Sequence, residues 1–141
     1  MPDSSITTVL AFDFGLKRIG VAVGQSLTKT AEPLPLLQAQ NGAPQWEKIQ
    51  QLIDEWKPNV LVVGVPVHMD GSEQDLTRFA TRFGNRLNGR FNLPVTWIDE
   101  RLSSYEAEAY LSDLNQQQLN DKLNVDSVSA MLILEQYFRD F

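Results

Sequence analysis

Two short apolar segments near the start of the chain, separated by four residues, constrain its fold more than any other feature. Apart from Asp13, the residues of Thr8–Phe14 (TVLAFDF) are apolar, aromatic or β-branched, which is typical of a strand. Gly15–Arg18 has the length of a tight turn, and Ile19–Gly24 alternates large and small residues. The pattern predicts an antiparallel β-hairpin. The glycine and alanine face of its second strand lets a helix or a ligand come close.

The middle of the chain continues with strand and helix patterns. Glu32–Ala39 reads as a third strand, which its two prolines make an edge strand or an irregular one. Apolar residues recur at helical spacing from Trp46 to Trp56, and Pro58 ends that helix. Val60–Val65 is a continuous apolar run, the pattern of a strand buried on both faces.

The last part adds one strand and three helical segments. Ser72 is a candidate N-cap for a helix whose apolar stripe is Leu76, Phe79, Ala80, Phe83 and Leu87. Pro94–Ile98 reads as a strand, Ser103 and Glu106 form a capping box, and Asp126 opens a final helix. We therefore expect one α/β domain over residues 1–141, a mixed five-stranded sheet with helices on both faces. Ligands bind such sheets at the strand ends.

Composition limits the chemistry. The 141 residues include no cysteine and one histidine, His68, so a bound metal needs oxygen ligands or that histidine. No apolar run approaches the about 18 residues of a membrane-spanning helix. The N-terminal segment lacks the basic start and apolar core of a secretory signal, so we expect a cytoplasmic protein without membrane partners.

Charge is distributed unevenly. Twelve Lys and Arg against eighteen Asp and Glu give a net charge of −6, which disfavours nucleic acid. The segment from Leu76 to Ile98 has no acidic residue, however, and Arg78, Arg82 and Arg86 recur there at every fourth position. On a helix they share one side. We interpret this side as a contact for a nucleic-acid backbone, with a solvated helix face as the alternative.

Three carboxylates stand where chemistry is expected. Asp13 interrupts a buried strand, Glu100 follows a strand, and Asp126 begins a helix. Each has a plain structural interpretation as well: a turn cap, a solvated loop charge and an N-cap, respectively. If they converge, their oxygen atoms suit a hard cation, Mg²⁺ or Mn²⁺. Two such ions can stabilise both the attacking and the leaving oxygen of a phosphodiester.

Several separated motifs, in order over nearly the whole chain, resemble the YqgF family, the Holliday-junction-resolvase-like proteins assigned to precursor 16S ribosomal RNA processing. The motifs are Asp13–Val23 (DFGLKRIGVAV), Gly64–Pro66, Met69–Glu73 (MDGSE), Asp99–Ser104 (DERLSS) and Val125–Ala130 (VDSVSA). The resemblance implies an RNase H-like fold and a nuclease that trims the 5′ end of the precursor. It also implies metal binding and catalysis by Asp13, Glu100 and Asp126.

By the same resemblance, Arg18 and Arg101 are cations placed for the scissile phosphate, although either could instead pair with a catalytic acid. Ser103 offers a hydroxyl, or only a helix cap. The chain departs from the family pattern at Leu16, where a small or polar residue is expected, and at Asn124, where a basic residue is common. The expected partner is precursor ribosomal RNA, either free or on the small ribosomal particle.

Other functions stay open at this point. The residues do not choose between RNA and branched DNA, so a Holliday-junction DNA resolvase is one alternative. A non-catalytic RNA-binding ribosome assembly factor is another, since it could keep the fold without using the site. The spacing Asp13-x-Gly15-x4-Gly20 also resembles the phosphate-binding hairpin of the actin and sugar-kinase superfamily. That superfamily closes a second related domain over its nucleotide, for which 141 residues leave no room.

Overall fold

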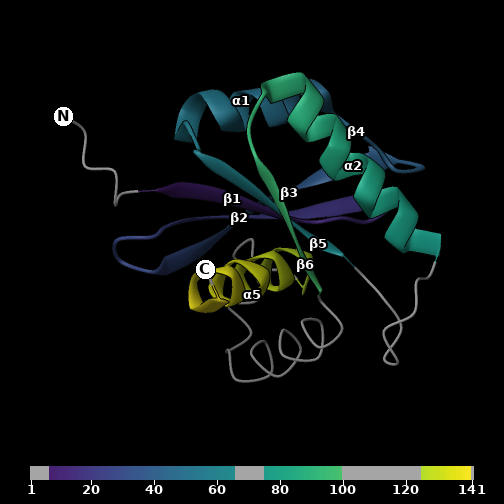
Figure 1. Cartoon of the computed structure of the whole chain (residues 1–141). Helices are drawn as coiled ribbons and strands as arrows, with labels where there is room; N and C mark the ends of the chain where they lie inside the picture. The colour runs from purple at the N-terminus through teal and green to yellow at the C-terminus, as the bar shows by residue number, and fades with distance from the viewer. Residues whose placement is uncertain (1–6, 66–74, 100–124, 141) are drawn as a thin grey trace.

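A computed structural model describes residues 7–65, 75–99 and 125–140 as one mixed sheet with helices on both faces (Figure 1). In chain order the elements are β1 (Thr8–Asp13), β2 (Arg18–Gln25), β3 (Thr30–Gln40), β4 (Ala43–Pro44), α1 (Trp46–Trp56), β5 (Val60–Val65), α2 (Asp75–Phe91), β6 (Val95–Asp99) and α5 (Val125–Asp140). The strand order is β4-β3-β2-β1-β5-β6. The first four strands pair antiparallel, and β1, β5 and β6 pair in parallel. The expected hairpin and the mixed sheet are confirmed.

The described sheet has six strands, so the expectation of five is wrong. The predicted Glu32–Ala39 strand extends to Thr30–Gln40 and then reverses through Asn41 and Gly42, which have φ angles of 49° and 85°. The chain returns as β4, which is only two residues long. A strand this short has no periodicity from which a pattern could predict it.

The prolines of β3 make the strand irregular, as expected. Ile19 pairs with Leu37 and Val21 pairs with Leu34, so two residues of β3 lie opposite one residue of β2. This β-bulge contains Pro35, which has no N–H to donate to the ladder. β3 is therefore paired with β2 along most of its length but bends at the bulge.

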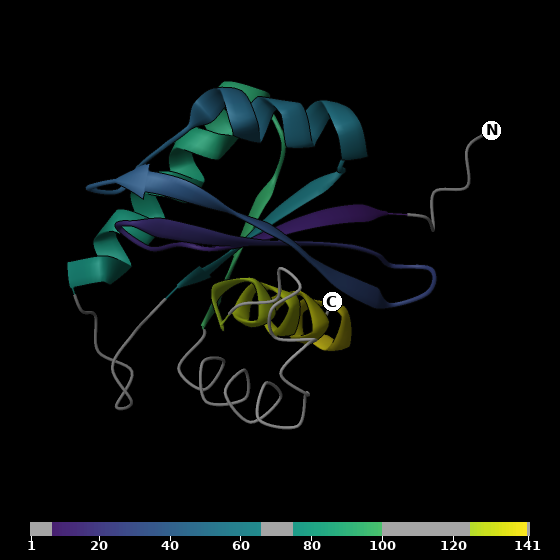
Figure 2. The ribbon, with the colours of Figure 1, turned by 180° about the vertical axis from the view of Figure 1, so that it is seen from behind.

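The sheet lies between α1 and α2 on one side and α5 on the other (Figure 2), and it separates two apolar cores. On one face Leu10, Phe12 and the large residues of β2 pack under α1 and α2. On the other face Val9 and Ala11 pack against α5. The alternation within β1 follows from the two-residue period of a strand, which sends successive side chains to opposite faces. No helix in the described ranges is long and apolar enough to cross a membrane.

α5 lies close to the sheet because the residues beneath it are small. Gly20, Ala22 and Gly24 alternate with the large residues of β2 that fill the other core. A Cβ atom added to Gly24 would lie 3.0 Å from side-chain atoms of Leu134 and Phe138, both in α5. The same atom would also collide with the backbone carbonyl of Thr30. The expected close approach to the small face is confirmed, and its occupant is a helix.

We expect Gly24→Ala to lower the free energy of unfolding by about 1–3 kcal/mol, because the methyl group has no space under α5. Gly89→Ala is the control, since a Cβ at Gly89 in α2 meets nothing within 4 Å. That substitution should raise stability by up to about 1 kcal/mol through helix propensity. Urea unfolding of both variants measures the difference. Equal stability of Gly24→Ala and wild type would contradict the close packing of α5 on β2.

Candidate functional site

Three parallel strands end at the same level of the sheet. Asp13, the last residue of β1, pairs in register with Gly64 of β5, and Gly64 pairs with Ile98 of β6. The final pair joins Val65 and Asp99. In open α/β sheets, ligands bind beyond the carboxyl ends of such strands. The position of Asp13 in the fold therefore agrees with a role in a site.

Asp13 lies on the face of the sheet that α5 covers. It continues the alternation of Val9 and Ala11, which pack in the α5 core, while Phe12 and Phe14 pack in the other core. Asp13 itself is half-buried, whereas Val9–Phe12 are fully buried. The carboxylate thus stands at the border between the apolar core and solvent.

The start of α5 lies at the same end of the sheet as Asp13. Leu134 contacts the Gly24 region, and Gly24 pairs with Val9 at the start of β1. Leu134 is eight residues after Asp126, which is about 12 Å along a helix. Val9 is four residues before Asp13, which is about 13 Å along a strand. The two lengths match, so α5 covers the distance from Gly24 to the end of β1. Figures 1 and 2 both place the end of β6 beside one end of α5.

Other packing agrees with this direction of α5. Val128, two residues after Asp126, is buried in the same apolar cluster as Ala11 and Ile98. The fold therefore brings the backbone of Asp126 toward Asp13. The interpretation of Asp126 as an N-cap is wrong, because α5 begins at Val125 and Asp126 stands inside its first turn. A carboxylate is favoured in that turn by the helix dipole.

The third predicted acid, Glu100, lies outside the described residues, as do Arg101 and Ser103. Glu100 directly follows Asp99, so the two Cα atoms are about 3.8 Å apart across the peptide bond. Among the side chains that the structure describes, no three acidic or histidine residues form a metal site. The carboxylates of Glu100 and Asp126 are not among those side chains, so the predicted triad stays a prediction.

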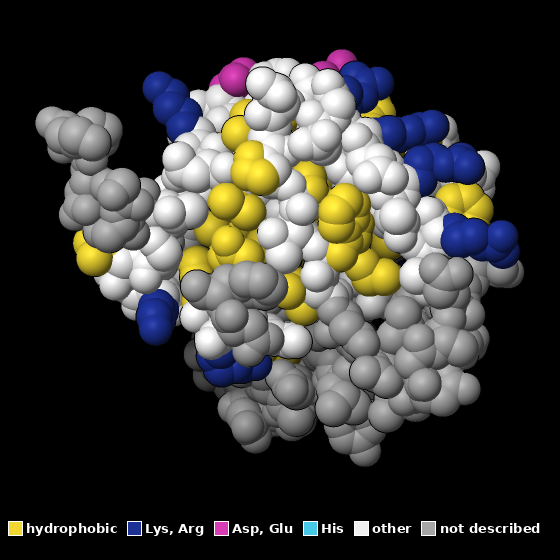
Figure 3. All heavy atoms as spheres, viewed as in Figure 1, with side chains coloured by type: hydrophobic (Ala, Val, Ile, Leu, Met, Phe, Trp, Pro, Cys, Tyr) yellow, Lys and Arg dark blue, Asp and Glu magenta, His cyan; other side chains and the backbone are white. Residues whose placement is uncertain are grey.

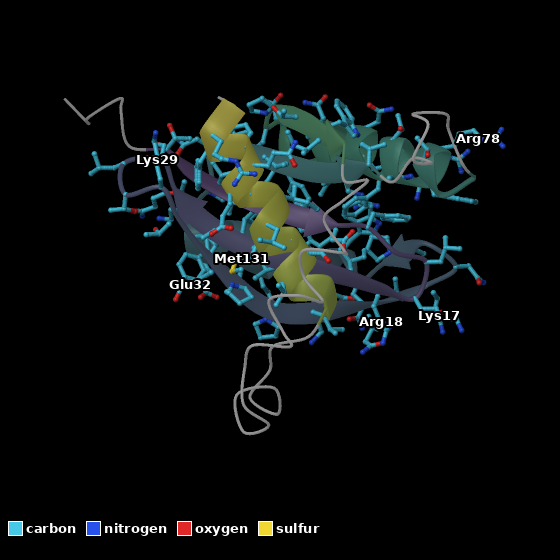
Figure 4. The ribbon with its side chains drawn as sticks, turned by 90° about the horizontal axis from the view of Figure 1, so that it is seen from below. Lys17, Arg18, Lys29, Glu32, Arg78 and Met131 are labelled. Carbon is cyan, nitrogen blue, oxygen red and sulfur yellow. The ribbon has the colours of Figure 1, made fainter. Side chains whose placement is uncertain are left out.

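Arg18 stands beyond the same end of β1. It is the first residue of β2 and is exposed, two residues before Gly20, which pairs with Asp13. Strand alternation places Arg18 on the face of Gly20 and Ala22, which is the α5 face. Figure 4 shows Arg18 and Lys17 at one end of the molecule and Lys29 at the other. A cation thus lies near the end where Asp13 is found.

The arginines of α2 form an exposed face, as the spacing predicts. Arg78, Arg82 and Arg86 are exposed, while Ala80 and Leu87 on the other side of the helix are buried. Lys and Arg side chains follow the edge of the molecule along α2, with apolar surface between them (Figure 3). The proposed contact with nucleic acid itself is not tested by this geometry.

Phe79, a member of the predicted apolar stripe of α2, is 40% exposed, whereas Phe83 and Leu87 of the same stripe are buried. Phe79 instead lines a pocket of about 160 Å³ between α2 and the turn from β3 to β4. The residues around this pocket are Phe14, Asn41, Gly42, Ala43, Pro44, Trp46, Phe79, Arg82, Phe83 and Arg86. Sequence reasoning missed the pocket. The sequence did contain one signal for it: the pocket residues Phe79, Arg82, Phe83 and Arg86 follow the i, i+3, i+4, i+7 spacing of one helix face.

Leu16, one of the two departures from the family pattern, packs against the neighbouring turn. The backbone N–H of Gly42 donates a hydrogen bond to the carbonyl oxygen of Leu16 at 2.9 Å. A Cβ added to Gly42 would lie 3.3 Å from a methyl carbon of Leu16. The larger residue is therefore accommodated by a glycine in the facing turn. The other departure, Asn124, lies outside the part of the chain that the structure describes.

The sequence of this chain matches a known protein family. The model of the RuvX family, described as Holliday junction resolvase, matches residues 7–140. A protein of Actinobacillus succinogenes named "Putative pre-16S rRNA nuclease" is 53% identical over 133 residues, which cover 94% of this chain and 95% of the relative. A protein of the same name from Paraburkholderia phymatum is 56% identical over 130 residues, covering 92% and 83% of the two chains.

Solved structures agree on the fold. The resolvase of fowlpox virus in complex with Holliday junction DNA aligns with a TM-score of 0.58 at 14% identity, over 94% of this chain and 97% of that one. Thermus thermophilus RuvC with a Holliday junction substrate aligns with a TM-score of 0.56 at 13% identity, over 95% and 94%. At these identities the alignments establish the fold alone. The expected RNase H-like fold, which these resolvases have, is confirmed.

Proposed function

Because this chain belongs to the RuvX family of Holliday junction resolvase-like proteins, we propose that it is a metal-dependent nuclease that trims the 5′ end of precursor 16S ribosomal RNA. The proposal rests on sequence similarity: over nearly the whole chain, more than half of the residues are identical to those of relatives named as pre-16S rRNA nucleases. The substrate is the precursor RNA, free or on the small ribosomal particle. The compartment we propose is the cytoplasm.

The site we propose consists of Asp13, Glu100 and Asp126. The two described backbone positions, at the end of β1 and in the first turn of α5, support their convergence. Carboxylate oxygens suit Mg²⁺ or Mn²⁺, and the chain has no cysteine to favour a softer metal. A divalent ion bound there would supply a Lewis acid for the scissile phosphate and an activated water.

The positive groups near this end of the sheet bind the substrate in our proposal. Arg18 is exposed beyond the end of β1, where its guanidinium can hold a phosphate by paired hydrogen bonds. Arg101 and Ser103 belong to the same proposed contact by their closeness to Glu100 in the sequence. Arg82 and Arg86 extend the contact over α2. These groups orient the phosphodiester while Asp13 keeps its carboxylate at the strand end.

We expect Asp13→Asn to reduce cleavage of a labelled 16S precursor 5′ segment at least about 100-fold, because the site loses one negatively charged ligand. RNA binding and the fold should persist. Asp54→Asn is the matched control, since Asp54 is exposed on α1 and its carboxylate accepts a hydrogen bond from Gln50. Reactions with Mg²⁺, with Mn²⁺ and with a chelator measure the metal requirement. Full activity of Asp13→Asn would refute this mechanism.

A four-way DNA junction tested beside the RNA distinguishes the alternatives. Cation-dependent cutting of the RNA alone supports the proposal. Cutting of the junction alone indicates the DNA resolvase activity that the family description names. Binding of RNA without cutting of either substrate indicates a ribosome assembly factor.

Metal binding should also stabilise the protein. An ion at a hundred times its Kd adds about 2.7 kcal/mol to the free energy of unfolding when it binds only the folded state. We therefore expect Mg²⁺ or Mn²⁺ to raise the Tm of the wild type and of Asp54→Asn by several degrees over the value in chelator. Asp13→Asn should respond much less. An equal rise in all three proteins would place the ion elsewhere.

Reversing the charge of Arg82 and Arg86 to Glu should weaken RNA binding and reduce its dependence on salt. For a single strand, the slope of log K against log salt should decrease by about 0.7 for every phosphate that the protein no longer neutralises. Lys29→Glu is the control, because Lys29 is exposed at the opposite end of the molecule (Figure 4). Titrations over a range of salt concentrations give the slopes. If the double variant and the control behave alike, α2 does not contact the RNA.

A further inference from the structure

We propose that the pocket between α2 and the β3–β4 turn binds one unpaired base of the nucleic-acid substrate. This inference rests on the proposed nuclease function and adds a subsite to it. The pocket has a volume of about 160 Å³ and combines aromatic walls with two arginines. Phosphate binding alone would need only the arginines, so the aromatic walls point to recognition of a base.

The floor of the pocket is a packed aromatic cluster. Phe83 is 2% exposed, and its ring centroid lies 5.2 Å from that of Phe14 and 6.0 Å from that of Trp46. The Arg90 guanidinium carbon lies over the Trp46 ring, 4.2 Å from its centroid. These rings hold one another in place, so the pocket exists before any ligand arrives.

The rim of the pocket supplies the groups that single-stranded nucleic acid needs. Phe79 is 40% exposed, a large ring left in solvent beside the floor. Arg82 and Arg86 follow it by three and seven residues on the same helix face and line the pocket with it. Both arginines are exposed, and neither forms an ion pair or hydrogen bond with another residue in the described ranges. Aromatic stacking combined with a positive surface is how proteins bind single strands.

The size of the pocket favours one ring. A cavity of about 150 Å³ holds benzene, so 160 Å³ accommodates a pyrimidine ring more easily than a purine. Asn41 stands at the opposite wall, in the β3–β4 turn, and its side-chain amide has both a donor and acceptors for a base edge. We therefore expect uracil or cytosine to be preferred over adenine.

The pocket lies at the end of the sheet where the candidate centre lies. Phe14 in its wall directly follows Asp13, and the two residues lie on opposite sides of the sheet. Because β5 and β6 are parallel, α2 runs back from the carboxyl end of β5, so Phe79 near its start belongs to this end. A strand that leaves the pocket around the sheet edge therefore approaches Asp13. The pocket would hold the RNA in register for cleavage.

The test is binding of short single-stranded oligonucleotides in chelator, where cleavage is absent. Phe79→Ala should weaken binding of an oligouridine about five- to 150-fold, the effect of removing one stacked base. Binding of the same backbone without bases should not change, and neither should the salt slope, because the arginines still hold the phosphates. Phe79→Leu, which keeps apolar volume without the ring, should behave like Phe79→Ala if stacking is the cause. Phe79→Trp should preserve binding.

Leu27→Ala is the matched control, because Leu27 is 60% exposed and lies in the turn between β2 and β3, far from the pocket. Unchanged oligouridine affinity in both Phe79→Ala and Phe79→Leu would overturn the pocket proposal. An equal loss of binding for the strand without bases would also overturn it. These results would leave the nuclease proposal intact, provided that wild type cleaves the precursor and Asp13→Asn does not. Failure of wild type to bind any single strand would overturn the pocket proposal, whereas cleavage of the precursor decides the nuclease proposal separately.

Discussion

The close contact between α5 and the small face of β2 is the interaction on which the candidate site depends. Gly24 has no space for a Cβ atom between the backbone of Thr30 and the side chains of Leu134 and Phe138. This contact fixes the height of α5 above the sheet. It also fixes the point along the sheet where α5 starts, and hence where Asp126 stands relative to Asp13. Packing of the C-terminal half of α5 on Gly24 thus sets the distance between Asp13 and Asp126, which are far apart in the sequence.

The sequence predicted the parts of the fold that have a strong local pattern. The hairpin of β1 and β2, the continuous run of β5 and the helix ended by Pro58 all appear as expected. Each depends on a periodicity or a helix stop that neighbouring residues determine. The pattern placed Asp13 inside a strand that continues to Phe14, whereas β1 ends at Asp13. The hypothesis that Asp13 binds a metal came from its carboxylate chemistry and from the family resemblance, and it stays a prediction.

The features that were missed depend on contacts between distant segments. β4 consists of two residues, and the positive φ angles at Asn41 and Gly42 that create it have no periodic signal. Phe79 fits an apolar stripe by spacing, yet it is 40% exposed and lines the pocket that the β3–β4 turn faces. An apolar residue on a helix is buried only if another segment of the fold packs against it. A helical pattern contains no information on that partner.

Asp13, the last residue of β1, and Phe14, which follows it, lie at two different surfaces of the molecule. One surface carries the carboxylate under α5, and the other opens into the pocket beside α2. The sheet isolates each surface from the other, since their side chains belong to separate cores. Changes on the surface of α2 therefore leave the packing around Asp13 unaltered. Substitutions of exposed residues on α2 would therefore allow a nuclease of this fold to acquire new substrates without changes to the rest of the structure.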